Sequence, residues 1–452
     1  MQWSAAQIVD ATHGVLRCPG PQGARLDGIG IDSRLLRPGM LFVPLRAERD
    51  GHDFIAAALA ARAGGYLVES DRIGRVDRPS ATAALAIEVV DARIALGGLG
   101  RAARDRLHGP VVGITGSVGK TSTKDLTASV LGTTLRVAAS EASFNNELGV
   151  PLTLANAPAD TNVAVVEMGA REPGNIDHLC AMARPTIGVV TAVAASHTAT
   201  FGTIEAVATA KGELVASLPA TGMAILNGDD PRVAAMAARS AAAVLLWSAE
   251  GRPGADVTAH DIRVDQDLRA SFVLRSSWGS VPVVLGARGI HQVGNALAAA
   301  AVALCCGVGL DGVASGLATA RLSPWRMEVR VAPGGGVVVN DTYNANPTSM
   351  AAALRSLAGL GALRRMAVLG TMAELGADEA YEHRRIANLA ADLGIEVIAV
   401  GTDRYGVAPA EDLAAAAAAV GPLGPGVAVL VKGSRVAGLE RLAAALLASS
   451  TL

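Results

Sequence analysis

The chain has 452 residues, of which 51% are hydrophobic and 18% are charged, and its formal net charge is -2 at pH 7. One ordinary core does not serve a chain of this length, so roughly two to four domains are expected, with three as the first estimate. The near-neutral charge gives no general attraction to polyanions, which argues against nucleic acid and anionic lipid as partners. Because the first residues lack a basic stretch followed by an apolar run, we expect a cytoplasmic protein without a secretory signal.

The composition gives no sign of a membrane span or a disulfide framework. The longest apolar stretch, residues 296–310, is shorter than the roughly 20 residues of a membrane-spanning helix, so it predicts a buried helix. Cys18, Cys180, Cys305 and Cys306 follow no disulfide or metal-binding spacing. We interpret them as reduced core residues.

The N-terminal part of the sequence predicts a small α/β domain. Residues 26–68 alternate short strand-like runs with turns and contain a helical segment at residues 54–63. A helical pattern follows over residues 92–107, and the His-Gly-Pro sequence after it places a boundary near Gly109. The first domain is therefore expected over residues 1–108.

From Pro110 onward, apolar runs rich in valine and isoleucine alternate with helical segments. Strands buried on both faces have this composition, so the pattern predicts a doubly wound parallel sheet in a central domain over residues 109–321. The same alternation begins again after Leu322 and predicts a Rossmann-like domain over residues 322–452. The expected fold class is α/β with three domains.

The sequence VVGITGSVGKTS places a glycine-rich turn between a strand and a helix, where backbone amides can hold phosphate oxygens. Ile114 stands where the strict spacing of such loops has its first glycine, so this is a compact variant. In the functional interpretation Lys120 contacts the β- and γ-phosphates and Thr121 ligates Mg²⁺. The alternative is a glycine turn with a surface lysine. The predicted ATP-binding residues of this loop are Gly116, Ser117, Gly119, Lys120, Thr121 and Ser122.

Three further polar residues follow the next strands of this domain. Glu167 ends an apolar strand at the edge where ligands of parallel sheets collect, which indicates a magnesium ligand, with a solvated or capping residue as the alternative. His197 follows the next strand, and Lys211 comes fourteen residues later. From the residues alone, we interpret His197 as a packed or surface residue and Lys211 as a solvated side chain of a helix.

These motifs resemble the Mur ligase family in order and spacing across nearly the whole chain. Besides TGSVGKTS they are FNNELGVPLT, EMGAREPGNI, SHTATFG, AKGEL, HQVGNALAAAA, RMEV, NDTYNANPTSM and LVKGSR. The resemblance implies magnesium ions held by Thr121, Glu167, His197 and a carbamylated Lys211, whose modification would turn a cation into a carboxylate-like anion. The catalytic residues that it implies are Lys120, Glu167, His197 and Lys211.

The resemblance also implies the remaining nucleotide contacts. It assigns Asn295 to adenine, with a helix N-cap as the alternative, Arg326 to the γ-phosphate and Asp341 to the nucleotide. The family commonly has His-Asn where this chain has His291 and Gln292.

The substrate-binding residues implied by the resemblance lie in several parts of the chain. IDSR and ERDGHDF resemble the family's UDP-muramoyl-binding segments, where a surface turn at Asp32 is the alternative. YNANPTSM resembles the motif of the family branch that adds D-alanyl-D-alanine, and the alternative is a turn without a binding role, capped by Ser349. For LVKGSR, the alternative to a substrate contact is a solvated strand end. Thr371 replaces the family's usual acidic residue, and Ala47 replaces an expected glycine. The set is Ser33, Arg34, Asn145, Asn146, Tyr343, Asn344, Asn346, Lys432, Ser434 and Arg435.

The expected function follows from this resemblance. It is an ATP-dependent ligase that joins D-alanyl-D-alanine to UDP-N-acetylmuramoyl-tripeptide through an acyl phosphate in peptidoglycan synthesis. Its cofactors would be ATP and Mg²⁺, its partners would be these two substrates, and we expect a monomer. The alternatives are an amide ligase that adds one amino acid to a muramoyl chain or glutamate to folate, and a regulatory phosphate-loop ATPase.

Overall fold

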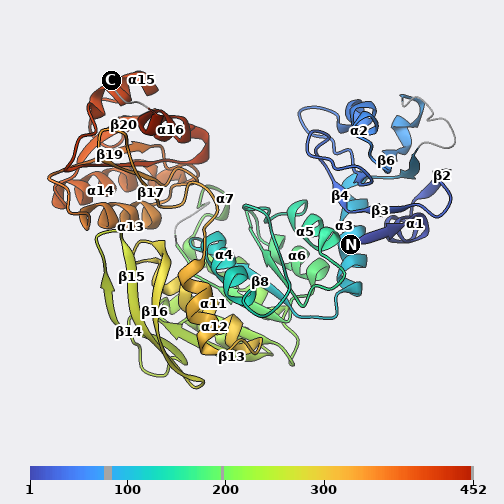
Figure 1. The fold of residues 1–452 in the computed structure, drawn as a ribbon, viewed down its shortest axis with the longest axis horizontal. Coiled ribbons are helices and arrows are strands. Elements are labelled where there is room, and N and C mark those ends of the chain that lie inside the picture. Colours follow the sequence, from blue (N-terminus) through green and yellow to red (C-terminus); the bar gives the residue numbers. More distant parts are fainter. Residues whose placement is uncertain (76–83, 195–197, 449–452) are drawn as a thin grey trace. The chain divides into compact units, whose positions relative to one another are not determined.

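The structure is a computed structural model, and it describes residues 1–75, 84–194 and 198–448. Its described residues form two compact units, and Figure 1 shows the path of the chain through them. The first unit comprises Met1–Gly113, Leu135–Gly169 and Ile176–Thr186. The second comprises Ile114–Thr134, Ala170–Asn175 and Ile187–Leu452.

A sheet in the N-terminal part of the first unit has five strands among the described residues, in the order β2-β7-β6-β5-β4. The last four strands run parallel, and β2 pairs antiparallel with β7. Strand β6 is buried along its whole length, as its apolar sequence predicts. The elements here include β1 (Gln2–Ser4), α1 (Ala5–Thr12), β2 (Val15–Pro19), β3 (Arg25–Asp27), β4 (Ile29–Gly30), β5 (Leu41–Phe42), α2 (Ile55–Ala60), β6 (Gly65–Glu69), β7 (Leu85–Val89) and α3 (Ala92–Arg106).

The helix predicted over residues 54–63 is shorter than expected. Residues Gly51–Phe54 form a 3-10 turn, because the Asp50 carboxylate accepts the backbone N–H of His52 and caps this tighter turn. The α-helix α2 then spans only Ile55–Ala60.

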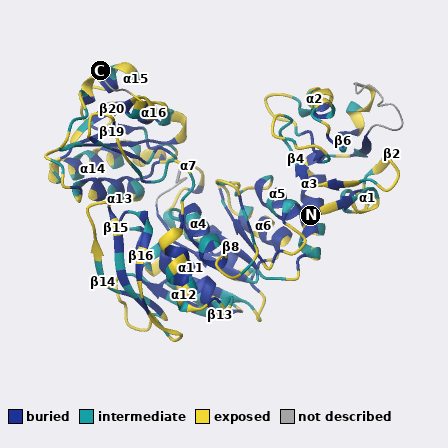
Figure 2. Cartoon of the chain, viewed as in Figure 1, coloured by how far each residue is buried: buried dark blue, intermediate teal, exposed yellow. Residues whose placement is uncertain are grey.

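The largest sheet has nine strands within the described part of the chain, in the order β16-β15-β14-β13-β12-β11-β8-β10-β9. Strands β8, β10 and β11 are buried throughout, as the valine-rich and isoleucine-rich runs predict, and β8 is labelled in Figure 2. The strands are β8 (Val111–Thr115), β9 (Val137–Ala139), β10 (Val163–Glu167), β11 (Ile187–Val190), β12 (Met223–Asn227), β13 (Ala243–Ser248), β14 (Val257–Val264), β15 (Arg269–Ser276) and β16 (Gly279–Arg288).

An antiparallel part extends this sheet beyond the predicted parallel strands. Strand β15 pairs antiparallel with both β14 and β16, whereas β11 to β14 pair in parallel. Exposed and buried residues alternate along β15 and β16, which is typical of strands with one solvated face.

The helix that follows the glycine-rich turn packs closely against two later helices. Helix α4 (Lys120–Leu131) contacts α11 (Gln292–Cys305) and α12 (Leu310–Thr319). Residues Ala296–Ala303 of α11 are fully buried, which confirms the predicted buried helix for this part of residues 296–310. The helix ends at Cys305, and a separate helix begins at Leu310, so the prediction of one helix to residue 310 is wrong. Over the described residues, no helix combines the length and apolar character needed to cross a membrane. Other elements of the nine-stranded sheet's layers are α5 (Gly149–Asn156), α6 (Asn175–Ala183), α7 (Thr198–Phe201), α8 (Ile204–Lys211), α9 (Glu213–Ala216) and α10 (Pro231–Ala234).

Two sequence interpretations of this region are wrong. Asn295 is not a helix N-cap, because α11 begins at Gln292 and His291 occupies the cap position. Cys18 and Cys180 are buried free thiols as expected, but Cys305 and Cys306 are only partly buried because α11 leaves the core at its C-terminal end.

The C-terminal sheet has the order β17-β18-β21-β19-β20, as far as the residues are described, with β17 as an antiparallel edge. Alternate residues of β19 and β21 enter two separate cores, as expected for strands covered on both faces. Helices α13 and α14 cover one face and α15 and α16 the other (Figure 1). The elements are β17 (Glu328–Val331), β18 (Val337–Asn340), α13 (Pro347–Ala358), β19 (Arg364–Gly370), α14 (Glu379–Asp392), β20 (Glu396–Val400), α15 (Leu413–Val420), β21 (Val427–Lys432) and α16 (Glu440–Ala448).

Candidate nucleotide and ligase site

The glycine-rich turn before α4, residues 116–119, is called the phosphate loop below. It requires glycine at two positions. Gly116 has φ 144 and Gly119 has φ 83, in a region that disfavours side chains. A Cβ atom on Gly116 would lie 2.0 Å from Thr191 Oγ1, and one on Gly119 would lie 2.5 Å from Asn295 Oδ1. Lys120 Nζ folds back over the loop and donates to the Gly116 carbonyl at 2.7 Å. The two glycines therefore allow the loop to pack closely against Thr191 and Asn295.

Arg326 lies against the first turn of α4. Its Nη2 donates to Thr121 Oγ1 at 2.8 Å, and its guanidinium stacks over the Tyr343 ring at 4.1 Å. Trp325 and Met327 on either side have φ 62 and φ 50, so two non-glycine residues adopt the left-handed conformation around this arginine. The structure thus brings together three predicted site residues from distant parts of the sequence.

Asn295 is buried beside the phosphate loop. Its Oδ1 accepts from Thr123 Oγ1 at 3.2 Å, and its Nδ2 donates to Gln292 Oε1 at 2.8 Å. Next to it, burial lowers the pKa of His291, which is therefore neutral near pH 7. The amide of Gln292 takes part in this network where the family commonly has asparagine.

Lys432 holds the turn that carries the predicted substrate residues. It is 2% exposed, and its Nζ donates to Asp341 Oδ2 at 2.5 Å, to the Asn344 carbonyl at 2.9 Å and to the Asp341 carbonyl at 3.4 Å. Asp341 Oδ1 accepts the backbone N–H of Met327 at 3.1 Å. An ammonium group has three N–H donors, so these contacts use the whole binding capacity of Lys432.

The neighbouring predicted residues also stabilise this turn. Asn346 is the N-cap of α13 and forms a reciprocal capping box with Ser349, so Ser349 is not the cap itself. Ser434 Oγ accepts from the Ala373 N–H at 2.9 Å, while the Arg435 guanidinium stacks over the Trp325 ring at 4.3 Å. Asn344 Oδ1 accepts from the backbone N–H of the residue after it at 2.8 Å. Polar side chains that were predicted to bind substrate thus have defined structural partners.

Glu167 ends β10 in the first unit and is 1% exposed. Asn145 Nδ2 donates to Glu167 Oε1 at 2.8 Å and orients the carboxylate. Asn146 Oδ1 accepts the Gly149 N–H at 3.0 Å, at the start of α5. The two asparagines of FNNELG therefore have different roles, one toward the glutamate and one toward a helix end.

Thr121 and Lys211, two further predicted metal ligands, belong to the second unit. Lys211 is the last residue of α8 and is 2% exposed. His197 lies outside the described residues. In the ranges 1–75, 84–194 and 198–448, no group of three or more His, Cys, Asp and Glu side chains could hold a metal ion.

Ser33 and Arg34 lie in a surface turn. The Arg34 side chain is 85% exposed, and its guanidinium binds the Asp32 carboxylate at 2.6 Å. The hydrogen bonds from Arg34 lower the pKa of Asp32. This geometry agrees with the alternative interpretation, a surface turn. That Ser33 and Arg34 contact a diphosphate stays a prediction.

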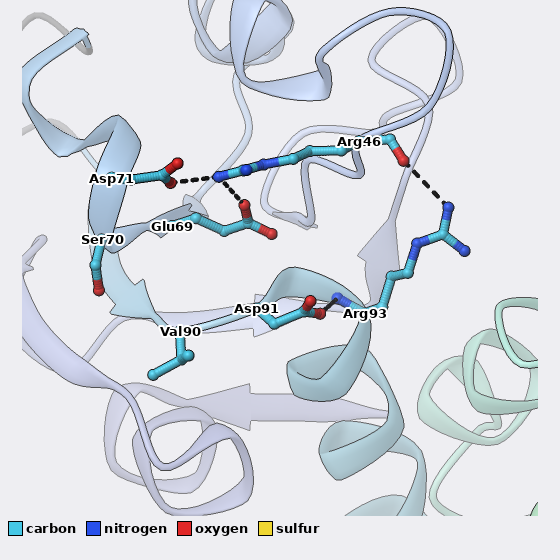
Figure 3. A pocket seen from close by; sticks show the side chains of 7 residues that line it. All are labelled: Arg46, Glu69, Ser70, Asp71, Val90, Asp91 and Arg93. Atoms are coloured by element: carbon cyan, nitrogen blue, oxygen red, sulfur yellow. Dashed lines mark hydrogen bonds and ion pairs between the residues drawn. The ribbon is translucent and has the colours of Figure 1, made fainter.

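A pocket of about 280 Å³ opens at the ends of β6 and β7 in the first unit (Figure 3). Arg46 forms ion pairs with Glu69 and Asp71, and Arg93 Nη2 donates to the Arg46 carbonyl at 3.1 Å. Asp91 caps α3 through the backbone N–H groups of Arg93 and the next residue. Arg46 is thus paired with two carboxylates of the pocket, whereas the ion-pair partner of Arg93 is Glu147, at 3.5 Å.

Sequence reasoning missed Asp125, which lies one turn after Thr121 on α4. Its Oδ2 accepts the Ser323 N–H at 2.6 Å, and its Oδ1 pairs with the buried Lys124 at 2.9 Å. Residues four apart on a helix share a face, so the spacing of Thr121 and Asp125 was a usable signal. What the sequence lacked was any indication that residues 323–326 return to this face.

Two family descriptions match the chain. The Mur ligase middle domain matches residues 114–303, and the Mur ligase, glutamate ligase domain matches residues 325–449. The chain belongs to the Mur ligase family.

Individual relatives give a more specific comparison than the family as a whole. The UDP-N-acetylmuramoyl-tripeptide--D-alanyl-D-alanine ligase of Mycobacterium tuberculosis is 38% identical, over 100% of this chain and 99% of that protein. MurF from Acinetobacter baumannii superposes with a TM-score of 0.86 at 29% identity, covering 99% of both chains. MurF from Thermotoga maritima in complex with ADP gives a TM-score of 0.77 at 27% identity, covering 92% of this chain and 96% of that one. The likeness therefore extends over the full length of these relatives.

Proposed function

We propose that this protein is the ATP-dependent ligase that joins D-alanyl-D-alanine to UDP-N-acetylmuramoyl-tripeptide. The observation that carries this proposal is the 38% identity, over essentially the whole of both chains, to ligases named for that reaction. The phosphate loop and the ADP complex of a relative at 27% identity support ATP as the energy source. The product is the pentapeptide precursor used in peptidoglycan synthesis.

The reaction requires two displacements. An oxygen of the tripeptide's terminal carboxylate attacks the γ-phosphorus of ATP, ADP leaves, and an acyl phosphate forms. The neutral amine of D-alanyl-D-alanine then attacks the acyl carbon, inorganic phosphate leaves, and the amine loses a proton. Lys120 and Arg326 are the cations assigned to the phosphates, and their positive charges stabilise the negative charge on the transferring group.

The donor atoms in the chain suit Mg²⁺, which prefers hard oxygen ligands and keeps several of its sites for water and substrate phosphate. The Thr121 hydroxyl and the Glu167 carboxylate are such ligands, and the hydrogen bond from Asn145 fixes one carboxylate oxygen of Glu167. His197 and a carbamylated Lys211 complete the proposed set. When bound, the ions neutralise phosphate charge and polarise the γ-phosphoryl group.

The remaining assignments belong to the same proposal. The chain has a UDP-muramoyl-binding domain at residues 1–108, an ATP-binding domain at 109–321 and a ligase domain at 322–452, and it works as a cytoplasmic monomer. Ser33 and Arg34 contact the UDP diphosphate. The residues that contact the two peptides come from the sets Asn145 and Asn146; Tyr343, Asn344 and Asn346; and Ser434 and Arg435. Lys432, which was also predicted to contact substrate, acts by holding the turn of Asn344.

Phosphate release from MgATP tests the function directly. The purified protein is given UDP-N-acetylmuramoyl-tripeptide, D-alanyl-D-alanine, or both, and products are weighed by mass spectrometry. We expect phosphate release with both substrates together and a new mass equal to the pentapeptide. Lys120→Ala should abolish release, because the loop loses its phosphate-binding cation. Release that needs neither substrate and yields no new amide would instead indicate a regulatory ATPase.

A further inference from the structure

The segment Thr191–Ala194, which follows β11, forms hydrogen bonds with the phosphate loop. The Ser117 N–H donates to the Ala192 carbonyl at 2.8 Å, and Ser117 Oγ donates to the Ala194 carbonyl at 3.0 Å. Thr191 Oγ1 donates to the Val118 carbonyl at 2.5 Å. Because the same Thr191 hydroxyl fills the space beside Gly116, this segment forms one wall of the loop.

The turn Asn227–Asp230, which follows β12, holds the same segment through two side chains. Asn227 Nδ2 donates to the Thr191 carbonyl at 2.8 Å, and Asp230 Oδ2 accepts the Val193 N–H at 2.7 Å. Asn227 is 9% exposed, and its Oδ1 accepts the Asp229 N–H at 2.9 Å, which fixes the amide's orientation. The turn therefore binds backbone groups of Thr191 and Val193, while the loop binds the backbone carbonyls of Ala192 and Ala194.

We infer that Asn227 and Asp230 are positioning residues for nucleotide binding, acting on the phosphate loop through Thr191–Ala194. Their side chains form hydrogen bonds with Thr191 and Val193, which lie outside the loop. They fix the backbone of Thr191–Ala194. Two carbonyl groups of this segment accept from the backbone N–H and the hydroxyl of Ser117. A loop that cradles phosphates with backbone amides depends on its backbone geometry, so loss of this support should weaken nucleotide binding. The inference rests on the proposed function, in which this loop binds ATP.

The adjacent aspartate provides a matched control. The Asp229 side chain contacts the end of β13 instead. Its Oδ1 accepts from Ser248 Oγ at 2.5 Å, and its Oδ2 accepts the Ala249 N–H at 2.7 Å. Neither contact involves Thr191–Ala194. Asp229 and Asp230 thus share a turn and a residue type but hold different segments.

Three variants separate positioning from general stability. Asp230→Ser keeps a hydroxyl that can cap α10 through the backbone N–H groups that Asp230 Oδ1 now holds, but it is too short to reach Val193. Asn227→Asp keeps the volume and the bond from Asp229, but it replaces the donor to Thr191 by an oxygen. Asp229→Ser is the control, with the same substitution at the neighbouring position.

The measurement is calorimetric binding of MgADP to each full-length protein, together with urea unfolding. Loss of one hydrogen bond that involves a charged or buried group corresponds to about a tenfold change in a binding constant. We expect Asp230→Ser and Asn227→Asp to weaken MgADP binding by about that factor, with a matching rise in the KM for ATP and an unchanged KM for D-alanyl-D-alanine. Asp229→Ser should lower the free energy of unfolding and leave MgADP binding unchanged.

Each outcome decides between the inference and its rivals. Wild-type affinity in both Asp230→Ser and Asn227→Asp would overturn the inference. Equal weakening in all three variants would also overturn it, because the effect would then be one of general stability. If Asp230→Ser does not fold, the isosteric Asn227→Asp decides alone. Failure of the wild-type protein to bind MgADP would refute the proposed function itself, and the inference with it.

Discussion

Lysine is rare in this chain, which has four lysines in its 452 residues, and all four lie within the described part and are at least partly buried. Lys120 contacts the phosphate loop, Lys124 pairs with Asp125, and Lys432 binds three oxygens. Lys211 is buried at the end of α8. An arginine cannot form a carbamate, so the choice of lysine at this position supports the proposed metal ligand.

Lys211 should be essential for turnover but not for folding. Lys211→Ala and Lys211→Arg should each lower the rate of phosphate release by at least about 100-fold, because neither side chain can become the anionic ligand. Carbon-13 NMR of the wild-type protein in labelled bicarbonate should show a carbamate signal that both variants lack. Near-wild-type rates in Lys211→Arg would remove the carbamate from the proposal.

His383 should make the free energy of unfolding depend on pH. It is fully buried, its Nε2 accepts the Met372 N–H at 2.9 Å, and its Nδ1 faces the Glu379 carbonyl at 2.7 Å. Burial lowers the pKa of His383, against smaller opposing effects of Glu379 and Glu382 and with Arg404 acting in the same direction as burial.

The sign of the pH effect follows from the difference in the pKa of His383 between the folded and the unfolded chain. As the pH falls below about 6.5, His383 takes up a proton in the unfolded chain but stays neutral in the folded protein until a lower pH, so the free energy of unfolding decreases. Urea unfolding between pH 8 and pH 5 measures this change. In His383→Gln that part of the pH dependence should be lost, and parallel curves for the two proteins would contradict the assignment.

At the scale of elements, the buried parallel strands were the most predictable part of the fold. Runs such as those of β8, β10 and β21 are apolar except for their last residue, because both faces of their sheets are covered. Strands β14 to β16 gave a weaker signal, because exposed residues alternate with buried ones along β15 and β16. The antiparallel extension of the sheet was missed for this reason.

Helix α13 shows how a residue assigned to substrate can also start a helix. Asn346→Ala should lower the free energy of unfolding by about 1 kcal/mol, because it removes the side-chain cap on the Ser349 N–H. Asn346→Ser should retain most of that stability. If Asn346 also contacts substrate, Asn346→Ser will raise the KM for a peptide substrate while its unfolding curve stays near that of the wild type. An unfolding curve of Asn346→Ala that matches the wild type would contradict the capping role.

At the scale of the whole molecule, sequence motifs indicated candidate site residues but not the contacts between them. Arg326 and Thr121 are 205 residues apart in sequence, and no local pattern predicts their hydrogen bond. The same holds for Lys432, whose motif indicated a substrate contact but whose donors are used on Asp341 and Asn344. Spacing along a chain shows which side chains follow a strand, whereas their partners depend on how distant segments return.

Nucleotide binding should stabilise the folded chain by mass action. With MgADP at 100 times its Kd, the free energy of unfolding should rise by about 2.7 kcal/mol, because the ligand binds the folded state alone. Urea unfolding with and without MgADP measures this rise. Lys120→Ala is the control, since it should unfold normally but show no response to the nucleotide. An equal response in both proteins would place the nucleotide away from the phosphate loop.

The burial of every lysine has a consequence for chemical labelling. Acylating reagents attack uncharged primary amines, and the arginines that supply the other basic side chains do not react with them. Lys124, Lys211 and Lys432 are each at most 3% exposed, whereas Lys120 is only partly buried. Apart from the terminal α-amine, an activated ester should therefore modify the native protein mainly at the phosphate loop, and bound nucleotide should protect it. Such labelling would tag the protein at its proposed ATP site without an engineered cysteine.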